Sequence, residues 1–110
     1  MNNDFNYQLL TDLFLFGRHK CWKCLKPHAD CFHHILKRVS NSPLNAAPLN
    51  NWECHLYDPD IHTEETRIKY LKMTYEFLID ERYKLKKEDI KFIFSYKEYY
   101  SWLKIGDNFS

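Results

Sequence analysis

The sequence has only two glycines among its 110 residues, and it contains no long run of apolar residues. Scarce glycine together with 17% aromatic residues excludes a disordered tail and favours an ordered, well-packed chain. Although 45% of the residues are apolar, the best candidate for a membrane span, residues 9–16, is broken by Thr11 and Asp12. No basic leader or small-residue cleavage site precedes it. We therefore expect a cytoplasmic protein without a membrane partner.

A large net charge is also lacking, because the formal net charge at neutral pH is only +1. The net charge does not indicate nucleic-acid binding, but the distribution of the charged residues along the chain does. Between residues 17 and 39 the single acid is Asp30, whereas six residues are basic: Arg18, Lys20, Lys23, Lys26, Lys37 and Arg38. From residue 51 onward 10 basic and 12 acidic residues balance. The basic stretch suits an anionic polymer such as DNA, and the alternative is an ordinary solvated face.

Four cysteines occur in the chain, at Cys21, Cys24, Cys31 and Cys54. In a reducing cytosol they are better explained by metal binding than by a disulfide framework. Two cysteines separated by two residues on a tight turn can present both thiolates to one tetrahedral zinc ion. We therefore predict a structural zinc held by Cys21, Cys24 and Cys54. The fourth ligand stays open among Cys31, His28 and His62, and Cys31 is equally explained as a core residue.

The first half of the chain predicts one helix and a small irregular region. Apolar residues recur at helical spacing over residues 4–16, with Gly17 as a C-terminal stop. The CxxC turn and residues 30–36 then form two short segments suited to a hairpin. Residues 40–51 show no periodicity, which indicates a loop or an irregular return strand, and another helix is expected to begin around residues 52–55.

The second half predicts two helices. Residues 63–78 carry an apolar stripe, and Thr63 is placed to cap the N-terminus. Residues 87–96 form the next helix. The side chains expected to face inward are Ile68, Leu71, Tyr75 and Leu78 on the first helix and Ile90, Ile93 and Phe94 on the second.

The pair His33-His34 suggests catalysis. Adjacent residues on a strand point to opposite faces, so one histidine can bind a metal while its neighbour accepts a proton from water. Imidazole has a pKa close enough to neutrality for that task. The dipeptide alone is weak evidence, but Asn45 and His55 follow it and the CxxC turn precedes it.

This order of motifs resembles the HNH endonucleases, the ββα-metal nucleases. The resemblance covers residues 21–62 and consists of CxxC, then HHI with a following Arg, then N-x-x-P-L, then CH. Each motif is common alone, whereas the ordered combination is specific. The sequence is most similar to small bacteriophage HNH proteins, including recombination endonucleases of the NinG type.

The resemblance implies an α+β fold in a single domain, residues 1–110. Its centre is a ββα-metal (HNH) core with a zinc knuckle at residues 18–62, flanked by an N-terminal helix at 1–17 and a C-terminal helical extension at 63–110.

It also implies a role for each matching residue. His33 stands at the first metal ligand, His34 at the general base, and His55 at the second metal ligand. Asn45 matches the residue that braces the hairpin loop and orients the base. The resemblance thus implies a metal-dependent enzyme that hydrolyses DNA phosphodiester bonds, with Lys37 and Arg38 at the DNA backbone.

The chain departs from the family pattern at two places. Family members with zinc usually carry a second CxxC, but here Asn51 replaces the partner of Cys54. Several members place another histidine about four positions after the helix histidine, whereas His62 lies seven positions after His55. His62 is open to three readings: a catalytic metal ligand, a zinc ligand or neither. Because His33 replaces the usual Asp, we expect Mn²⁺, Ni²⁺ or Zn²⁺ to serve beside Mg²⁺.

Two further alternatives stay open. The protein can be a zinc-stapled DNA-binding or adaptor module without catalysis, or a protein-binding module. The aromatic residues near the C-terminus can stack on unpaired bases of branched DNA, pack helices together or form a homodimer interface. They are Tyr96, Tyr99, Tyr100 and Trp102.

Overall fold

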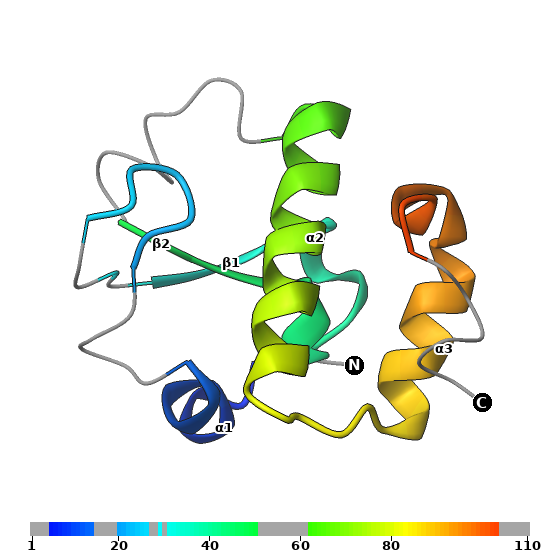
Figure 1. The fold of residues 1–110 in the computed structure, drawn as a ribbon, viewed down its shortest axis with the longest axis horizontal. Coiled ribbons are helices and arrows are strands. Elements are labelled where there is room, and N and C mark those ends of the chain that lie inside the picture. The colour runs from blue at the N-terminus through cyan, green and yellow to red at the C-terminus, as the bar shows by residue number, and fades with distance from the viewer. Residues whose placement is uncertain (1–4, 15–19, 27–28, 30, 51–61, 104–110) are drawn as a thin grey trace.

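The computed structural model describes residues 5–14, 20–26, 29, 31–50 and 62–103. Within them lie three α-helices, short 3-10 turns and one two-stranded antiparallel sheet, which confirms the α+β class predicted from the sequence. Figure 1 shows the long helix α2 crossing in front of the sheet, with α1 below it and α3 on its other side. No helix in the described ranges is long and apolar enough to cross a membrane. The helix expected around residues 52–55 lies outside the described residues.

Helix α1 spans Tyr7–Leu13 and is shorter than the predicted range. Asn6 caps it, because the side chain of Asn6 accepts a hydrogen bond from the backbone N–H of Leu9 at 3.2 Å. Leu10 in the helix and Phe5 and Phe14 on either side of it are all buried in the core. The apolar spacing that predicted this helix therefore marks its buried face.

The sheet corrects the predicted hairpin. Strand β1, Cys31–His34, pairs with β2, Ala46–Leu49, and not with the CxxC turn; Phe32 faces Pro48 and His33 faces Ala47 across the pair. For residues 40–51 the sequence indicates a loop or an irregular return strand, and the structure shows a return strand at Ala46–Leu49. All four of its residues are buried, so the strand lacks the alternation of polar and apolar residues that reveals a half-exposed strand.

Helix α2, Glu64–Asp80, confirms the most extensive prediction. Thr63 is its N-cap and accepts a hydrogen bond from the backbone N–H of Thr66 at 3.2 Å. Leu71, Tyr75 and Leu78 are buried, as the apolar stripe requires, and Ile68 is half-buried. The helix packs against β2 and the turn before it. The two strands and the helix that follow one another in the sequence therefore also lie together in space (Figure 1).

Helix α3, Lys87–Ser95, and the 3-10 turn η4, Lys97–Tyr100, close the described chain. The prediction that Phe94 faces inward is wrong, because 49% of its surface is exposed. Phe92 and Ile93 form the buried face together with Asp89, which turns Phe94 outward. The buried face of α3 thus includes the carboxylate of Asp89, which the apolar pattern does not indicate.

A buried hydroxyl joins three segments at the centre of the fold. Thr74 of α2 is fully buried; it accepts a hydrogen bond from Trp22 Nε1 and donates one to the carbonyl of Ala46, both at 2.8 Å. Trp22 lies in the CxxC turn and Ala46 begins β2. Thr74 therefore ties the turn, the sheet and the long helix together.

We expect Thr74→Val to lower the free energy of unfolding by about 2 kcal/mol, because a buried donor and a buried acceptor lose their partner while the shape is kept. Chemical denaturation measures the change. Thr66→Val on the exposed first turn of α2 is the control and should cost less, since water can replace its hydrogen bonds. Equal losses in the two variants would contradict the central role of Thr74.

Candidate functional site

Asn45 holds together the loop that follows β1. Its side-chain amide donates to the carbonyls of Lys37, at 2.9 Å, and Ser40, at 3.0 Å, and its Oδ1 accepts from the backbone N–H of Leu36 at 2.8 Å. The carbonyl of Asn45 also accepts from the N–H of Ile35 at 2.8 Å. The side chain is fully buried, and its bond to the N–H of Leu36 is shielded from water. Asn45 thus fixes the chain directly after the histidine pair.

The loop needs this support because Lys37 has a φ of 61°. A residue with a Cβ atom loses energy in the left-handed region, where its side chain approaches the backbone. The hydrogen bond from Asn45 to the Lys37 carbonyl offsets that cost.

The histidine pair occupies two different environments, as alternation on β1 requires. His33 is 5% exposed and lies beside His62, with the ring centroids 5.3 Å apart and the planes tilted by 55°. His62 is exposed and stands one residue before the N-cap of α2. The structure therefore brings a strand histidine and a helix-entry histidine together.

His34 lies against the N-terminal segment. Its ring stacks on Phe5 with the centroids 3.8 Å apart and the planes 8° from parallel. The residue is half-buried, so one part of the imidazole is covered while another reaches solvent. His34 is thereby held apart from the His33 and His62 rings, on a separate aromatic support.

The CxxC turn carries hydrogen bonds suited to a thiolate. The Sγ of Cys21 accepts from the backbone N–H groups of Lys23 and Asn50, both at 3.4 Å. Leu25 adopts a φ of 62° and donates its N–H to the Cys21 carbonyl at 3.0 Å, which closes the turn. Donors aimed at sulfur favour its charged form, the form that binds zinc.

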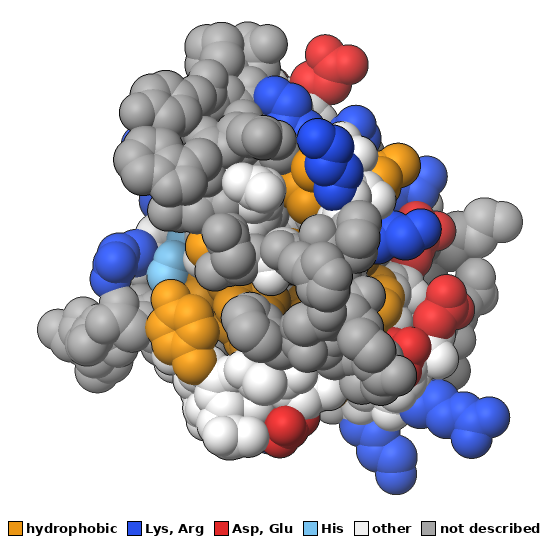
Figure 2. Space-filling model, turned by 90° about the vertical axis from the view of Figure 1, so that its left-hand side faces the viewer, with side chains coloured by type: hydrophobic (Ala, Val, Ile, Leu, Met, Phe, Trp, Pro, Cys, Tyr) orange, Lys and Arg blue, Asp and Glu red, His pale blue; other side chains and the backbone are white. Residues whose placement is uncertain are grey.

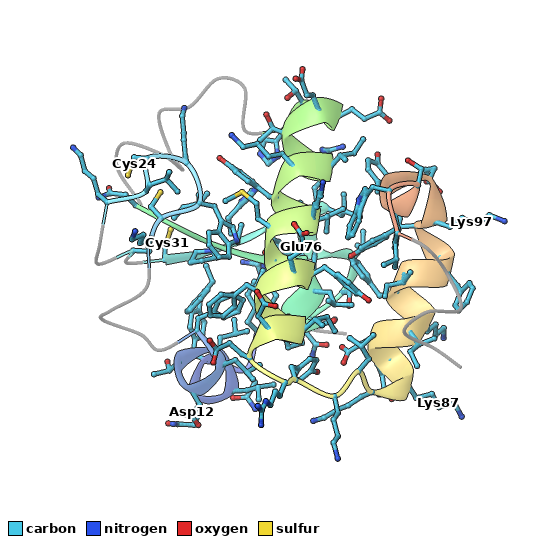
Figure 3. All side chains as sticks on the ribbon, in the orientation of Figure 1. Asp12, Cys24, Cys31, Glu76, Lys87 and Lys97 are labelled. Atoms are coloured by element: carbon cyan, nitrogen blue, oxygen red, sulfur yellow. The ribbon has the colours of Figure 1, made fainter. Side chains whose placement is uncertain are left out.

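The surroundings of Cys24 and Cys31 are described, whereas those of Cys54 are not. The Sγ of Cys31 lies 3.3 Å from the carbonyl of Leu49, within hydrogen-bond distance for a thiol donor. Figure 3 shows Cys24 and Cys31 on the same side of the molecule, away from Lys87 and Lys97. Cys54 and His28 lie outside the described residues.

Within the described residues no group of three or more His, Cys, Asp or Glu side chains could hold a metal ion. His55, the predicted second metal ligand, lies outside the described residues. Of the predicted metal ligands in the described chain, His33 and His62 lie side by side, and Cys21 and Cys24 share one turn.

Lys37 and Arg38, predicted at the DNA backbone, are both exposed on the loop that Asn45 braces. The broader surface is mixed in charge. Figure 2 shows lysine and arginine side chains around hydrophobic side chains on the face that carries the CxxC turn, with acidic side chains among them.

A carboxylate network behind the loop was not predicted. Asp89, 2% exposed, accepts hydrogen bonds from Ser42 Oγ at 2.6 Å and from Tyr83 OH at 2.5 Å. Burial and the bond to Asp89 raise the pKa of the Tyr83 hydroxyl, which therefore stays a donor. Because Ser42 Oγ also accepts from the N–H of Leu44, the network links α3 to the residue next to Asn45. In the sequence, the only signal is an acid at the third position of a helix.

The aromatic residues near the C-terminus divide into two groups. Tyr100 is 1% exposed and lies edge-on to Tyr75 and Phe92, so it packs the helices together. Tyr96 and Tyr99 are half-buried and line a pocket with Arg67, a residue that the sequence did not indicate.

Comparison of the chain with protein-family models, curated proteins and solved structures finds no match.

Proposed function

We propose that the protein is a metal-dependent endonuclease that hydrolyses DNA phosphodiester bonds. The observation that carries the proposal is the meeting of His33 and His62, with ring centroids 5.3 Å apart, at the point where β1 lies next to the start of α2. Two imidazoles at this separation can direct one nitrogen each to a single divalent ion. The resemblance of the motifs to HNH endonucleases supports the same chemistry.

In this proposal each residue has a separate role in the reaction. His33 and His62 hold the metal, with His55 as a further ligand, and His34 accepts a proton from the attacking water. A divalent ion held by these residues would supply positive charge, which stabilises the charge that develops on the phosphoryl group and the departing oxygen. Asn45 keeps the loop after the histidines in place, and Lys37 and Arg38 contact the DNA backbone. The nitrogen-rich ligand set favours Mn²⁺, Ni²⁺ or Zn²⁺ beside Mg²⁺.

The CxxC turn has a different task in this proposal. Cys21 and Cys24, together with Cys54, hold a structural zinc that fixes the turn against the core. The two N–H groups that point to Cys21 Sγ support a thiolate at this position. Because the Sγ of Cys31 lies within hydrogen-bond distance of the Leu49 carbonyl, we favour another residue as the fourth ligand. His62 lies beside His33 and is better placed at the catalytic metal.

Titration with Mn²⁺ tests the metal pair. Replacing His33 or His62 by alanine should weaken Mn²⁺ binding by roughly tenfold or more, because each substitution removes one ligand. His34→Ala is the matched control and should keep the affinity, since His34 is assigned to the proton and not to the metal. Isothermal titration calorimetry on the zinc-loaded protein gives the three affinities, and cleavage of supercoiled DNA is followed on the same samples. Unchanged Mn²⁺ affinity in both His33 and His62 variants would contradict the assignment.

The second candidate function is a zinc-stapled DNA-binding or adaptor module without catalysis. The hydrogen bonds around Cys21 favour it as much as they favour an enzyme, because a structural zinc serves either protein. This candidate predicts zinc in the purified protein, DNA binding that weakens with salt, and no cleavage with any divalent ion.

A further inference from the structure

A small pocket opens between the loop after β1, helix α2 and the C-terminal segment. Its volume is about 190 Å³, and it is lined by Leu36, Lys37, Arg67, Tyr96 and Tyr99. Figure 1 shows α3 and η4 beside α2, and the contact between α2 and η4 closes this side of the molecule. Three parts of the chain that are distant in the sequence thus form one cavity.

The described part of the pocket lining is cationic. Of the described residues that line it, Lys37 and Arg67 are charged, and none is an acid. The Nε of Arg67 is buried and has no hydrogen-bond partner among the residues that the structure describes. A buried donor without a partner costs free energy. A phosphate matches this arrangement, because a guanidinium binds its oxygens with two parallel hydrogen bonds.

The other walls are aromatic. Tyr96 and Tyr99 are half-buried, so their rings are accessible from the pocket. Tyr96 also lines a second, larger pocket of about 400 Å³, whose further walls include Phe92, Lys91 and Ser95. Aromatic rings next to a phosphate site bind nucleic-acid bases by stacking, and only unpaired bases expose the face that stacking requires.

The pocket is joined to the candidate catalytic site through the braced loop. Lys37 lies four residues after His33, and its carbonyl accepts a hydrogen bond from the Asn45 side chain at 2.9 Å. The segment that carries the histidines therefore also fixes the backbone of the cationic wall.

We propose that this pocket binds a phosphate and the adjacent unpaired base of a DNA strand, and that it gives the protein a preference for single-stranded over fully paired DNA. Arg67 and Lys37 bind the phosphate, and Tyr96 and Tyr99 stack on the base. The inference deepens the proposed function, since it assigns the kind of DNA that reaches the histidines.

Fluorescence anisotropy with a labelled single-stranded oligonucleotide and the same strand in a duplex tests the inference. The measurements are made with the zinc-loaded protein and Mg²⁺ omitted. We expect tighter binding of the single strand, and Arg67→Gln should weaken it about tenfold through loss of a charge-assisted phosphate contact. The slope of the logarithm of the binding constant against the logarithm of the salt concentration should also become shallower by about 0.7, because one phosphate contact is removed. Arg82→Gln makes the same change of charge on an exposed residue outside the pocket, and should change the affinity less than about twofold.

Tyr99→Leu separates stacking from charge. It should weaken binding of the single strand several-fold and leave binding of the duplex unchanged, because paired bases do not stack on the pocket. Arg67→Lys keeps the charge without the guanidinium fork and should bind with intermediate affinity; thermal unfolding confirms that each variant is folded.

Three results would overturn the inference: equal affinities for single strand and duplex, equal effects of Arg67→Gln and Arg82→Gln, or wild-type affinity in the Tyr99 variant. Equilibrium binding measured with Mg²⁺ omitted does not require cleavage. If the protein binds single strands through Arg67 but does not cleave DNA, the proposed function is refuted and this inference is not. If it cleaves DNA but Arg67→Gln does not weaken binding, this inference is refuted and the proposed function is not.

Discussion

Replacing His34 by alanine should slow cleavage of supercoiled DNA by about 10²- to 10⁴-fold, the usual effect of removing a general base. The metal affinity should stay unchanged, because the ring of His34 is stacked on Phe5 and not on the His33 and His62 pair. Initial rates of conversion from supercoiled to nicked plasmid, in Mg²⁺ and in Mn²⁺, measure the effect.

Loss of activity through misfolding needs a separate control. His34→Phe keeps an aromatic ring against Phe5 and removes the proton acceptor, so it should be as inactive as the alanine variant while unfolding at a higher temperature. The stacked pair is worth about 1 kcal/mol beyond its buried area. Cleavage that survives both substitutions would show that His34 is not the base, and it would also reveal a contaminating nuclease.

Replacing Asn45 by alanine should lower the free energy of unfolding by about 3 kcal/mol, because three hydrogen bonds are lost and the N–H of Leu36 is left buried without its partner. The partners are the N–H of Leu36 and the carbonyls of Lys37 and Ser40. Urea denaturation gives the change in stability. Cleavage should fall as well, since the loop after the histidine pair would no longer be held.

Asn45→Asp is the matched variant for this prediction. A carboxylate still accepts from Leu36, but it cannot donate to the two carbonyls, and it brings a charge into a fully buried position. We expect it to be at least as destabilising as alanine near neutral pH. Asn41→Ala on the exposed part of the same loop is the control, with an effect within about 0.5 kcal/mol. Wild-type stability in Asn45→Ala would contradict the bracing role.

The elements that local pattern determines were predictable. Helix α2 begins at the residue after Thr63 because a threonine cap and an apolar stripe are both encoded within a few positions. Strand β2 was not predictable in the same way, since its four residues are all buried and the pattern of a half-exposed strand is absent. The same limitation explains Phe94, which points outward because the buried Asp89 takes part of the inner face of α3.

In the candidate site, too, the residues themselves were predictable from the sequence, whereas their surroundings were not. Motif spacing singled out His33, His34 and Asn45, and the structure places them on one strand and its following loop. Their surroundings depend on long-range packing. Phe5 reaches His34 and Asp89 reaches Ser42 across the fold, and no periodicity in the sequence connects these residues. The pocket around Arg67 combines three distant segments; the sequence indicated Lys37, Tyr96 and Tyr99 separately, but not Arg67 or the meeting of these residues.

The stack of Phe5 on His34 has a spectroscopic consequence. An imidazole lying 3.8 Å above a phenyl ring sits in the shielding zone of the ring current, so its carbon-bound protons should resonate at unusually high field. This signal would separate His34 from His33 and His62, whose rings lie beside each other. It would report the docking of the N-terminal segment on the candidate site in solution, before metal or DNA is added.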